Sequence, residues 1–219
     1  WKKITKPKIL LVSLLKIMAK DTKILEYAPP DISDLKYICG IDEVGRGAGA
    51  GPVVTAAVIL PKNFKSELIR DSKKLTENQR NKAYKLILEN AIEITCEAIS
   101  AKDINLIGIN PATFKAMHLC LDKLTQKPEH ILVDGTVWEK YSDTPVTTVP
   151  KGDDTYTCIA AAAIVAKVRR DDYMNKIHIL HPLYQWNGNK GYLSSGHIDA
   201  LKKNGATRYH RTQYIKNFV

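Results

Sequence analysis

Apolar residues recur along the chain with two different periods, and these periods predict its strands and helices. Residues 37–42 and 53–60 are apolar or β-branched runs separated by a glycine-rich stretch, which predicts a hairpin. Residues 130–134 and 146–149 are two further short apolar runs. A half-buried strand is predicted where apolar residues alternate with polar ones, at Ile92, Ile94, Cys96 and Ala98.

Two helices are predicted, because two capping signals are each followed by apolar residues at helical spacing. Thr76 and Gln79 form a capping box, and Asn110 is a good N-cap with Pro111 in the first turn. The core-facing positions expected of the first helix are Ala83, Leu86, Ile87 and Ala91, and those of the second are Ala112, Ala116, Met117, Cys120 and Leu124. An alanine-rich helix is expected from about Tyr156. No repeat or flexible linker interrupts the chain after Pro30, so we interpret it as one α/β domain.

The N-terminal segment needs a separate interpretation. Residues 9–18 are apolar, but the run is short and contains Lys16, so it cannot span a bilayer. Trp1 is not an initiator residue, whereas Met18 opens the polar segment that leads to the first strand. We therefore expect an N-terminal extension over residues 1–30, not native before Met18, and a single domain over residues 31–219 that includes a basic C-terminal segment.

Composition narrows the class of partner. The chain has 219 residues and a formal net charge of +10, which suits a polyanionic partner but also fits an anionic membrane or an ordinary soluble surface. The four cysteines are far apart and form no Cys-x-x-Cys pair, so we expect reduced core thiols and neither a zinc site nor a disulfide framework.

Acidic residues lie at the ends of predicted strands. Asp42 and Glu43 end the first strand and are followed by Gly45-Arg46-Gly47. Adjacent side chains of a regular strand point to opposite faces, so the two acids converge only where the backbone bends, and glycine permits such a bend. The alternative for an isolated Asp-Glu pair is a solvated hairpin turn.

Two further acidic positions make a shared site more plausible. Asp134 ends the strand over residues 130–134, and Asp153 and Asp154 precede the alanine-rich helix. Taken alone, Asp153 and Asp154 fit helix capping. If the strands that end in Asp42 and Asp134 are neighbours, however, their carboxylates meet at one edge of the sheet.

Several carboxylates surrounded by Lys and Arg indicate a site for hard divalent cations such as Mg²⁺ or Mn²⁺. Two such cations can promote an in-line phosphoryl displacement by water, with no protein nucleophile. The chain has no Gly-x-Ser-x-Gly motif, in agreement with this chemistry.

Two other classes of protein were weighed. Gly45-x-Gly47-x-x-Ala50, with Asp71 downstream, mimics a dinucleotide-binding fingerprint, but that motif must open a helix and residues 52–60 predict a strand. A non-catalytic nucleic-acid-binding protein would keep the basic surface. Clustered acids argue against it, because they repel phosphate unless a metal neutralises them.

Ten blocks of the sequence, in order, resemble type 2 ribonuclease H, known in bacteria as ribonuclease HII. They are residues 37–47, 51–54, 71–75, 112–117, 133–135, 151–153, 159–171 and 189–192, together with His197 and the basic pair His210-Arg211. The turn Gly45-Arg46-Gly47 favours this type over ribonuclease HIII. Ala48 and Ala50, and residues 106–110, depart from the pattern expected of the family.

The resemblance implies roles for particular residues. Asp42, Glu43, Asp134 and Asp153 are implied to be the catalytic, metal-binding carboxylates, with Asp154 a neighbour only. Gly45, Arg46 and Gly47 are implied to recognise the ribose 2′-hydroxyl, and Tyr192 to stack on the following sugar. The further substrate contacts are expected among Lys73, Lys74, Thr113, Lys167, Arg169 and Arg170. Asp171 is expected to orient an Arg or Lys, and His197 is either structural or close to the site.

The implied fold is ribonuclease H-like: a mixed central sheet flanked by helices, with a helical C-terminal region. The implied activity is endonucleolytic cleavage of RNA–DNA hybrids, and of duplex DNA 5′ to single ribonucleotides, giving 3′-hydroxyl and 5′-phosphate ends with Mg²⁺ or Mn²⁺. The resemblance also implies a cytoplasmic monomer that acts in ribonucleotide excision repair and DNA replication. A replication clamp is a possible partner that the sequence itself does not indicate.

Overall fold

The structure, a computed structural model, describes residues 24–219, so the hypothesis about residues 1–17 lies outside the described residues. In this part of the chain a five-stranded sheet has the order β3-β2-β1-β4-β5. The strands are β1 (Ile38–Val44), β2 (Val53–Ile59), β3 (Glu93–Ile99), β4 (His130–Asp134) and β5 (Val146–Val149). β1 and β3 pair antiparallel with β2, whereas β1, β4 and β5 are parallel. The predicted hairpin and mixed sheet are thus confirmed.

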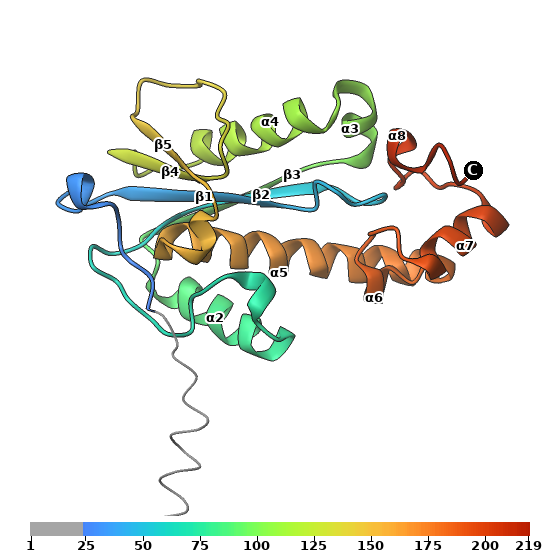
Figure 1. Ribbon diagram of the computed structural model, residues 1–219, viewed down its shortest axis with the longest axis horizontal. Coiled ribbons are helices and arrows are strands. Elements are labelled where there is room, and N and C mark those ends of the chain that lie inside the picture. Colours follow the sequence, from blue (N-terminus) through green and yellow to red (C-terminus); the bar gives the residue numbers. More distant parts are fainter. Residues whose placement is uncertain (1–23) are drawn as a thin grey trace, which may run out of the picture.

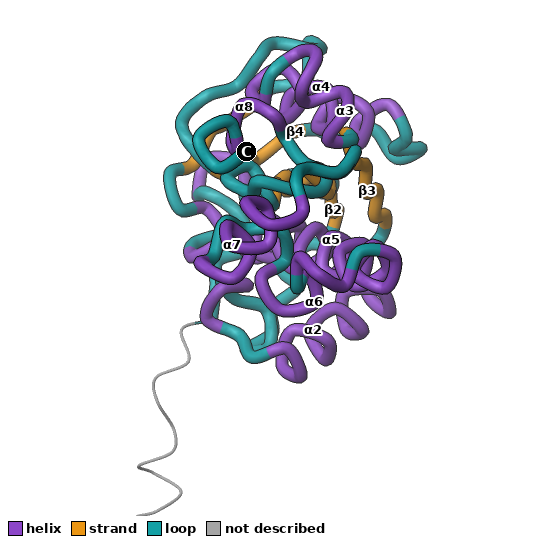
Figure 2. The backbone as a smooth tube through the Cα atoms, turned by 90° about the vertical axis from the view of Figure 1, so that its right-hand side faces the viewer, coloured by secondary structure: helices purple, strands orange, loops and turns teal. Residues whose placement is uncertain are grey.

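Helices cover both faces of this sheet (Figure 1). The α-helices are α2 (Glu77–Asn90), α3 (Ala101–Ile107), α4 (Ile109–Asp122), α5 (Thr157–Leu180), α6 (Trp186–Asn189), α7 (Ser195–Asn204) and α8 (Thr212–Ile215). Short 3₁₀ helices are η1 (Pro30–Ile32), η2 (Ser72–Lys74), η3 (Gly152–Asp154) and η4 (Pro182–Tyr184). Figure 2 views the sheet from the side on which the C-terminal helices lie. It shows α3 and α4 on one side of the strands and α2 and α5 on the other.

α5 packs unusually close to the central strand β1. A Cβ atom on Gly40 would lie 2.2 Å from the backbone carbon of Cys158, so only glycine fits at this crossing. The helix presents small residues there, with Ala160, Ala161 and Ala162 fully buried. This contact fixes the N-terminal end of α5 beside the middle of the sheet.

α4 covers the opposite face. Four of the five predicted core positions lie in α4 and are buried, as expected, and the fifth, Leu124, is buried just after the helix ends. Asn110 is not the N-cap, however, because α3 ends and α4 begins at Gly108, whose φ of 84° breaks the helix. Asn110 therefore lies inside the first turn of α4. The sequence analysis did not predict α3.

The other predicted elements agree with the structure, with one exception in β3. Thr76 and Gln79 form the capping box of α2. In β3, the buried residues are Thr95 and Ile99. Ala98 and Ile92, both predicted to face the core, are exposed, and Ile92 precedes the strand. β3 is an edge strand, and helix α5 covers too little of it to bury both faces.

The C-terminal elements pack beyond the end of the sheet around a core that includes Met174, Trp186 and Leu201. The four cysteines are free thiols, as predicted, and three of them are buried. Among the described residues, no helix combines the length and the apolar character that crossing a bilayer requires.

Part of the predicted N-terminal extension packs against the domain. Leu25 and Tyr27 are buried, and Glu26 forms an isolated parallel bridge with Tyr156 just ahead of α5. The Thr157 hydroxyl donates a hydrogen bond to the carbonyl oxygen of Glu26. These contacts hold the chain next to the start of α5.

Candidate metal centre and substrate cleft

Asp42 and Asp134 lie at the same level on neighbouring parallel strands. Ile41 pairs with Val133, and each acid follows its member of that pair. Side chains at equivalent positions of paired strands point to the same face. The condition set by the sequence, that the two strands be neighbours, is met.

Asp153 reaches the same place from the segment between β5 and α5. Lys151 adopts a left-handed conformation and turns the chain into η3, which carries Asp153. The backbone N–H of Gly152 then donates a hydrogen bond of 2.7 Å to Oδ1 of Asp134. The turn before α5 is therefore tied directly to the end of β4.

The three aspartates form one compact group. One carboxylate oxygen from each of Asp42, Asp134 and Asp153 lies within 4.8 Å of the others. Asp42 and Asp153 are 6% and 5% exposed, so water screens them poorly. Burial raises the pKa of Asp42 well above its ordinary value, and the neighbouring acids raise it further. Burial also raises the pKa of Asp153, although Lys73 opposes the shift.

Glu43 lies on the other face of β1. The strand continues to Val44, so the bend predicted directly after Asp42 comes later, and Glu43 points toward α4. It lines a cleft of about 260 Å³ together with Phe114, Met117 and Asp134. Burial raises the pKa of Glu43, opposed by Arg46. Glu43 is outside the compact group, and its role as a fourth ligand stays a prediction.

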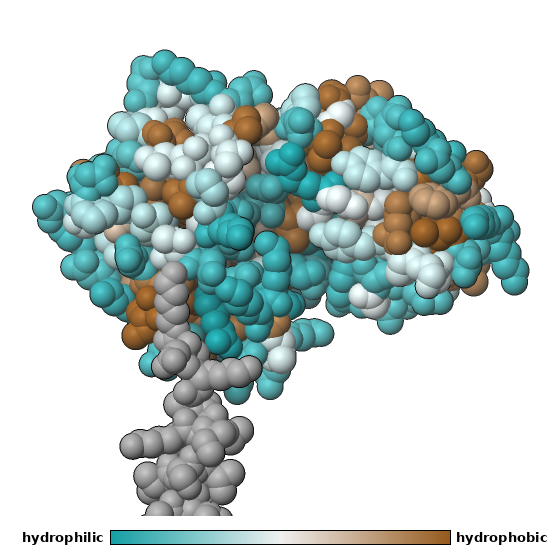
Figure 3. Space-filling view, in the orientation of Figure 1, coloured by the Kyte–Doolittle hydropathy of each residue, from teal (hydrophilic) through white to brown (hydrophobic). Residues whose placement is uncertain are grey.

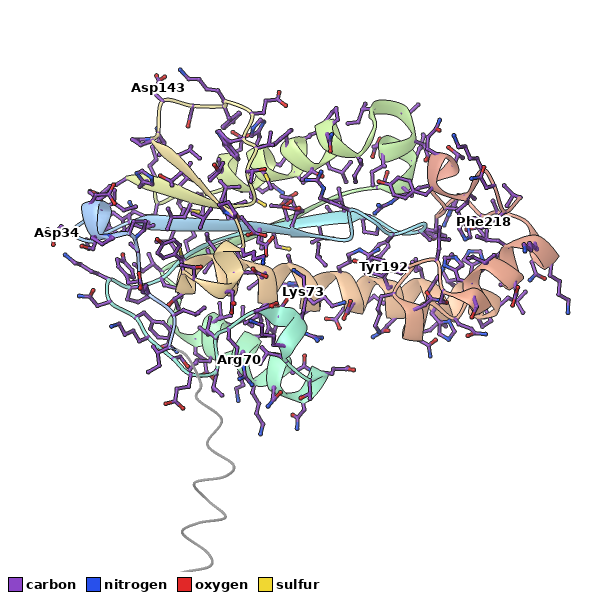
Figure 4. All side chains as sticks on the ribbon, viewed as in Figure 1. Asp34, Arg70, Lys73, Asp143, Tyr192 and Phe218 are labelled. Carbon is purple, nitrogen blue, oxygen red and sulfur yellow. The ribbon has the colours of Figure 1, made fainter. Side chains whose placement is uncertain are left out.

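Lys73 and Lys74 lie beside the acidic residues, and Figure 4 shows Lys73 on the side of the sheet that α5 covers. The Lys73 ammonium is 3.4 Å from Oδ2 of Asp153, and the Lys74 ammonium is 2.7 Å from Oδ1 of Asp154. Hydrophilic residues predominate in the middle of the view in Figure 3. Asp71 caps η2 by accepting from the backbone N–H of Lys73. The short helix thus presents two ammonium groups at the rim of the acid group.

A half-buried network supports η2 from the side away from the two ammonium groups. Arg80 donates to the carbonyl oxygens of Ser72 and Leu75, on either side of the two lysines. Asp171 lies 3.7 Å from Arg80 and 2.8 Å from Lys167. Asp171 therefore orients an Arg and a Lys, as expected. Lys167 forms its ion pair within the protein, with Asp171.

The glycine turn follows β1 at the other rim of the site. Gly45 has a φ of 89°, which residues with a side chain rarely adopt, and a Cβ there would lie 2.1 Å from Nε of Arg170. The position therefore requires glycine for two reasons, its backbone conformation and the lack of space. Arg46 extends along the cleft, 3.6 Å from Glu43, and donates a 2.7 Å hydrogen bond to Asn110. Its side chain remains 47% exposed.

Tyr192 stands between the glycine turn and the C-terminal helices (Figure 4). Its ring is 41% exposed, and the Arg170 guanidinium lies 5.6 Å from the ring centroid. His197 is fully buried and lies 2.9 Å, through Nδ1, from the Tyr192 carbonyl oxygen. Of the two interpretations of His197, the structure thus favours the structural one.

Three of the expected substrate contacts lie elsewhere. Thr113 is fully buried, and its hydroxyl donates to the Ile109 carbonyl oxygen, so it is not among the residues proposed to touch substrate. Arg169 is exposed near Tyr84 and the edge strand β3, away from the acids. Arg170 is fully buried and bonded to backbone carbonyls, so the expectation that it contacts phosphate is wrong.

Asn110 and Arg211 have roles that the sequence did not predict. Asn110 was interpreted as a helix cap but holds Arg46. Arg211 was noted only as part of a basic tail, yet it is fully buried under the glycine turn. No local pattern signals either contact, because each joins segments that are distant in the sequence.

The acid group fits a hard divalent cation. Its donors are carboxylate oxygens from three separate segments, which is the donor set that Mg²⁺ and Mn²⁺ prefer. Two of the three carboxylates are buried and Asp134 is half-buried, and after burial itself the neighbouring acids contribute to the raised pKa of Asp42. A bound cation would relieve the repulsion among the three.

Comparison with known proteins gives sequence relatives and structural neighbours. The family model for ribonuclease HII matches residues 39–217. A ribonuclease HII of Bacteroides thetaiotaomicron is 49% identical over 175 residues, which cover 80% of this chain and 88% of that protein.

Two solved structures show the same fold. The ribonuclease H2 of Pyrococcus horikoshii OT3 is similar with a TM-score of 0.69 and 25% identity, over 83% of this chain and 96% of that one. Bst-RNase HIII in complex with Mn²⁺ has a TM-score of 0.63 at 16% identity, over 94% and 78% of the two chains. At that identity the second likeness supports the fold alone.

Proposed function

Because the chain belongs to the ribonuclease HII family, and is therefore a ribonuclease H endonuclease that depends on a divalent metal, we propose that it cleaves duplex DNA 5′ to embedded ribonucleotides. RNA–DNA hybrids are the second proposed substrate. The products are a 3′-hydroxyl and a 5′-phosphate. The catalytic domain is proposed to comprise residues 31–219.

The observation that carries this proposal is the approach of three carboxylate oxygens to within 4.8 Å. We propose Asp42, Asp134 and Asp153 as ligands of two divalent cations, with Glu43 completing the set. Both Mg²⁺ and Mn²⁺ are supported by the hard oxygen donors. Cations held there would lower the pKa of the attacking water and stabilise charge on the leaving oxygen.

The residues of the chain position the scissile phosphodiester. Lys73 and Lys74 project from η2 with side chains 79% and 55% exposed, so their ammonium groups can approach the phosphates that flank the cleavage point. The two ammonium groups lie at the rim of the acid group, with Lys73 3.4 Å from Asp153. A polyanion is thus attracted to the rim while the acids hold the cations.

Recognition of the ribose is assigned to the turn Gly45-Arg46-Gly47 and to Tyr192. A 2′-hydroxyl both donates and accepts hydrogen bonds, so a rigid backbone turn can distinguish RNA from DNA. Gly47 has open space around its Cα, since an added Cβ would meet no atom within 4 Å. Tyr192 offers an exposed ring on which the next sugar can stack.

The direct test uses duplex DNA with a single ribonucleotide, incubated with the protein and Mg²⁺ or Mn²⁺. The expected result is one nick 5′ to the ribonucleotide, with a 3′-hydroxyl that a polymerase can extend. All-DNA duplex of the same sequence is the control and should stay intact. Folded protein that binds the ribonucleotide duplex but nicks it with neither metal would instead be a non-catalytic nucleic-acid-binding protein.

A further inference from the structure

Three segments that are distant in the sequence meet at the glycine turn. The backbone N–H of Ala50 donates to the Gly191 carbonyl oxygen at 3.1 Å. On the other side, the N–H of Gly51 donates to Tyr209, and the N–H of Arg211 donates to Gly49, both at 2.8 Å. The turn over residues 45–51 is thus held between the segment that carries Tyr192 and the segment over residues 209–211.

Arg170 joins two of these segments through one guanidinium group. Nε donates to the Pro52 carbonyl oxygen at 2.9 Å and Nη2 to that of Ala50 at 3.0 Å. Nη1 donates to the Lys190 carbonyl oxygen at 2.8 Å, two residues before Tyr192. Because a guanidinium is planar and rigid, it fixes the positions of these carbonyl groups relative to one another.

Arg211 holds the turn itself. Nε donates to the Gly51 carbonyl oxygen at 3.0 Å and Nη1 to that of Arg46 at 2.8 Å. It therefore bonds the turn near both its ends. Nη2 is buried and has no hydrogen-bond partner among the described residues.

Neither guanidinium has an acid partner among residues 24–219. Both residues have zero exposure, and no carboxylate in the described part of the chain lies within 4.0 Å of either. Burying two neighbouring cations without a counter-ion is costly. Burial and Arg170 lower the pKa of Arg211. Apolar residues could fill the same space without the desolvation cost of a buried charge. The feature that only the two arginines supply is their set of hydrogen bonds to the turn.

We propose that Arg170 and Arg211 are positioning residues that fix the glycine turn relative to Tyr192, and so set the preference for a ribonucleotide followed by a deoxyribonucleotide. This inference rests on the proposed function. A single ribonucleotide offers one register, in which the ribose meets the turn and the next sugar meets Tyr192. An all-RNA strand offers a ribose in every register. Its cleavage therefore depends less on the distance between the glycine turn and Tyr192.

The test measures kcat and KM for two substrates, a duplex with one ribonucleotide and an RNA–DNA hybrid. The variants are Arg211→Lys and Arg211→Gln. Lysine keeps the charge but loses the planar set of N–H donors of the guanidinium. Arg208→Gln is the matched control, because Arg208 is an exposed arginine three residues earlier. Circular dichroism and thermal unfolding show whether each variant is folded.

The expected result is a decrease of about tenfold in the ratio of kcat/KM for the single ribonucleotide over that for the hybrid, mainly through kcat, in both Arg211 variants. Arg208→Gln keeps the wild-type ratio. An equal loss on both substrates, an unchanged ratio, or two unfolded Arg211 variants would each overturn the proposal. A wild type that nicks neither substrate would refute the proposed function itself, which is a separate result.

A second measurement asks whether Arg211 acts through Tyr192. In a Tyr192→Ala background, Arg211→Lys should change the substrate ratio by less than about twofold, because the partner whose position it fixes is gone. A tenfold change in that background, equal to the change seen with Tyr192 present, would show independent effects and contradict the positioning role.

Discussion

The ammonium of Lys73 lies 3.4 Å from Oδ2 of Asp153, although the two residues are 80 positions apart in the sequence. Burial lowers the pKa of Lys73, but Asp153, Asp71 and Asp42 outweigh it, and the pKa is raised. The lysine places one positive charge beside an otherwise acidic group. A divalent cation should therefore have a large effect on this site.

Metal binding should stabilise the fold by relieving repulsion among the acids. With free Mn²⁺ at a hundred times its dissociation constant, we expect the free energy of unfolding to rise by about 2.7 kcal/mol. Asp42→Asn should lose most of this increase, whereas Asp199→Asn, at an exposed position of α7, should keep it. Chemical denaturation with Mn²⁺, Mg²⁺ or a chelator measures the effect. Equal stability under all three conditions would argue against a metal site.

Asp134→Asn should separate chemistry from folding. Asparagine keeps the Oδ1 acceptor for the N–H of Gly152, so the free energy of unfolding should change by less than about 1 kcal/mol. It removes a charge from the proposed ligand set, and kcat should fall by a factor of about 100 or more. Nicking assays and urea denaturation on the same preparation give both values. A nearly normal kcat would mean that the metal centre has been assigned to the wrong residues.

Gly40→Ala should displace α5 from β1. The added Cβ would lie 2.2 Å from the Cys158 backbone, which cannot move without shifting the helix. We expect a loss of about 3 kcal/mol in the free energy of unfolding, together with lower activity, because Asp153 directly precedes α5. Gly188→Ala is the matched control, since its Cβ would meet nothing within 4 Å. Similar stabilities of the two variants would contradict the close packing.

Acid should destabilise the C-terminal region through His210. Burial, with His197 and His181 nearby, lowers the pKa of His210 to about 4. Its ordinary value is about 6.5, so between these values the unfolded chain takes up a proton that the folded protein excludes. Stability is therefore full above pH 6.5 and decreases as pH falls toward 4, by about 3 kcal/mol in total.

Denaturation at several pH values between 7.5 and 4 tests this, with His210→Gln and His118→Gln compared. The groups that face His210 are His197, 3.0 Å away, the stacked rings of Tyr184 and Trp186, and Thr207. His210→Gln should flatten the decrease, and His118→Gln on α4 should not. The same pH dependence in all three proteins would assign the effect to other groups.

The sequence alone determined the order of strands and helices and the chemistry of the site. Periods of two and of helical spacing reflect which side chains are buried, so β4, β5 and the core face of α4 could be predicted locally. The clustering of Asp42 and Asp134 could be predicted conditionally, because both end a strand. The condition, that β1 and β4 are neighbours, could not be derived from either strand by itself.

Only the tertiary structure decided which acids meet and which cations are available. Glu43 differs from Asp42 by one position, but β1 continues past it and places it on the opposite face. Arg170 and Arg211 read as surface charges in the sequence, yet both are enclosed beneath the glycine turn. Such outcomes depend on strand pairing and on contacts between segments more than 100 residues apart, which no local pattern of polar and apolar residues encodes.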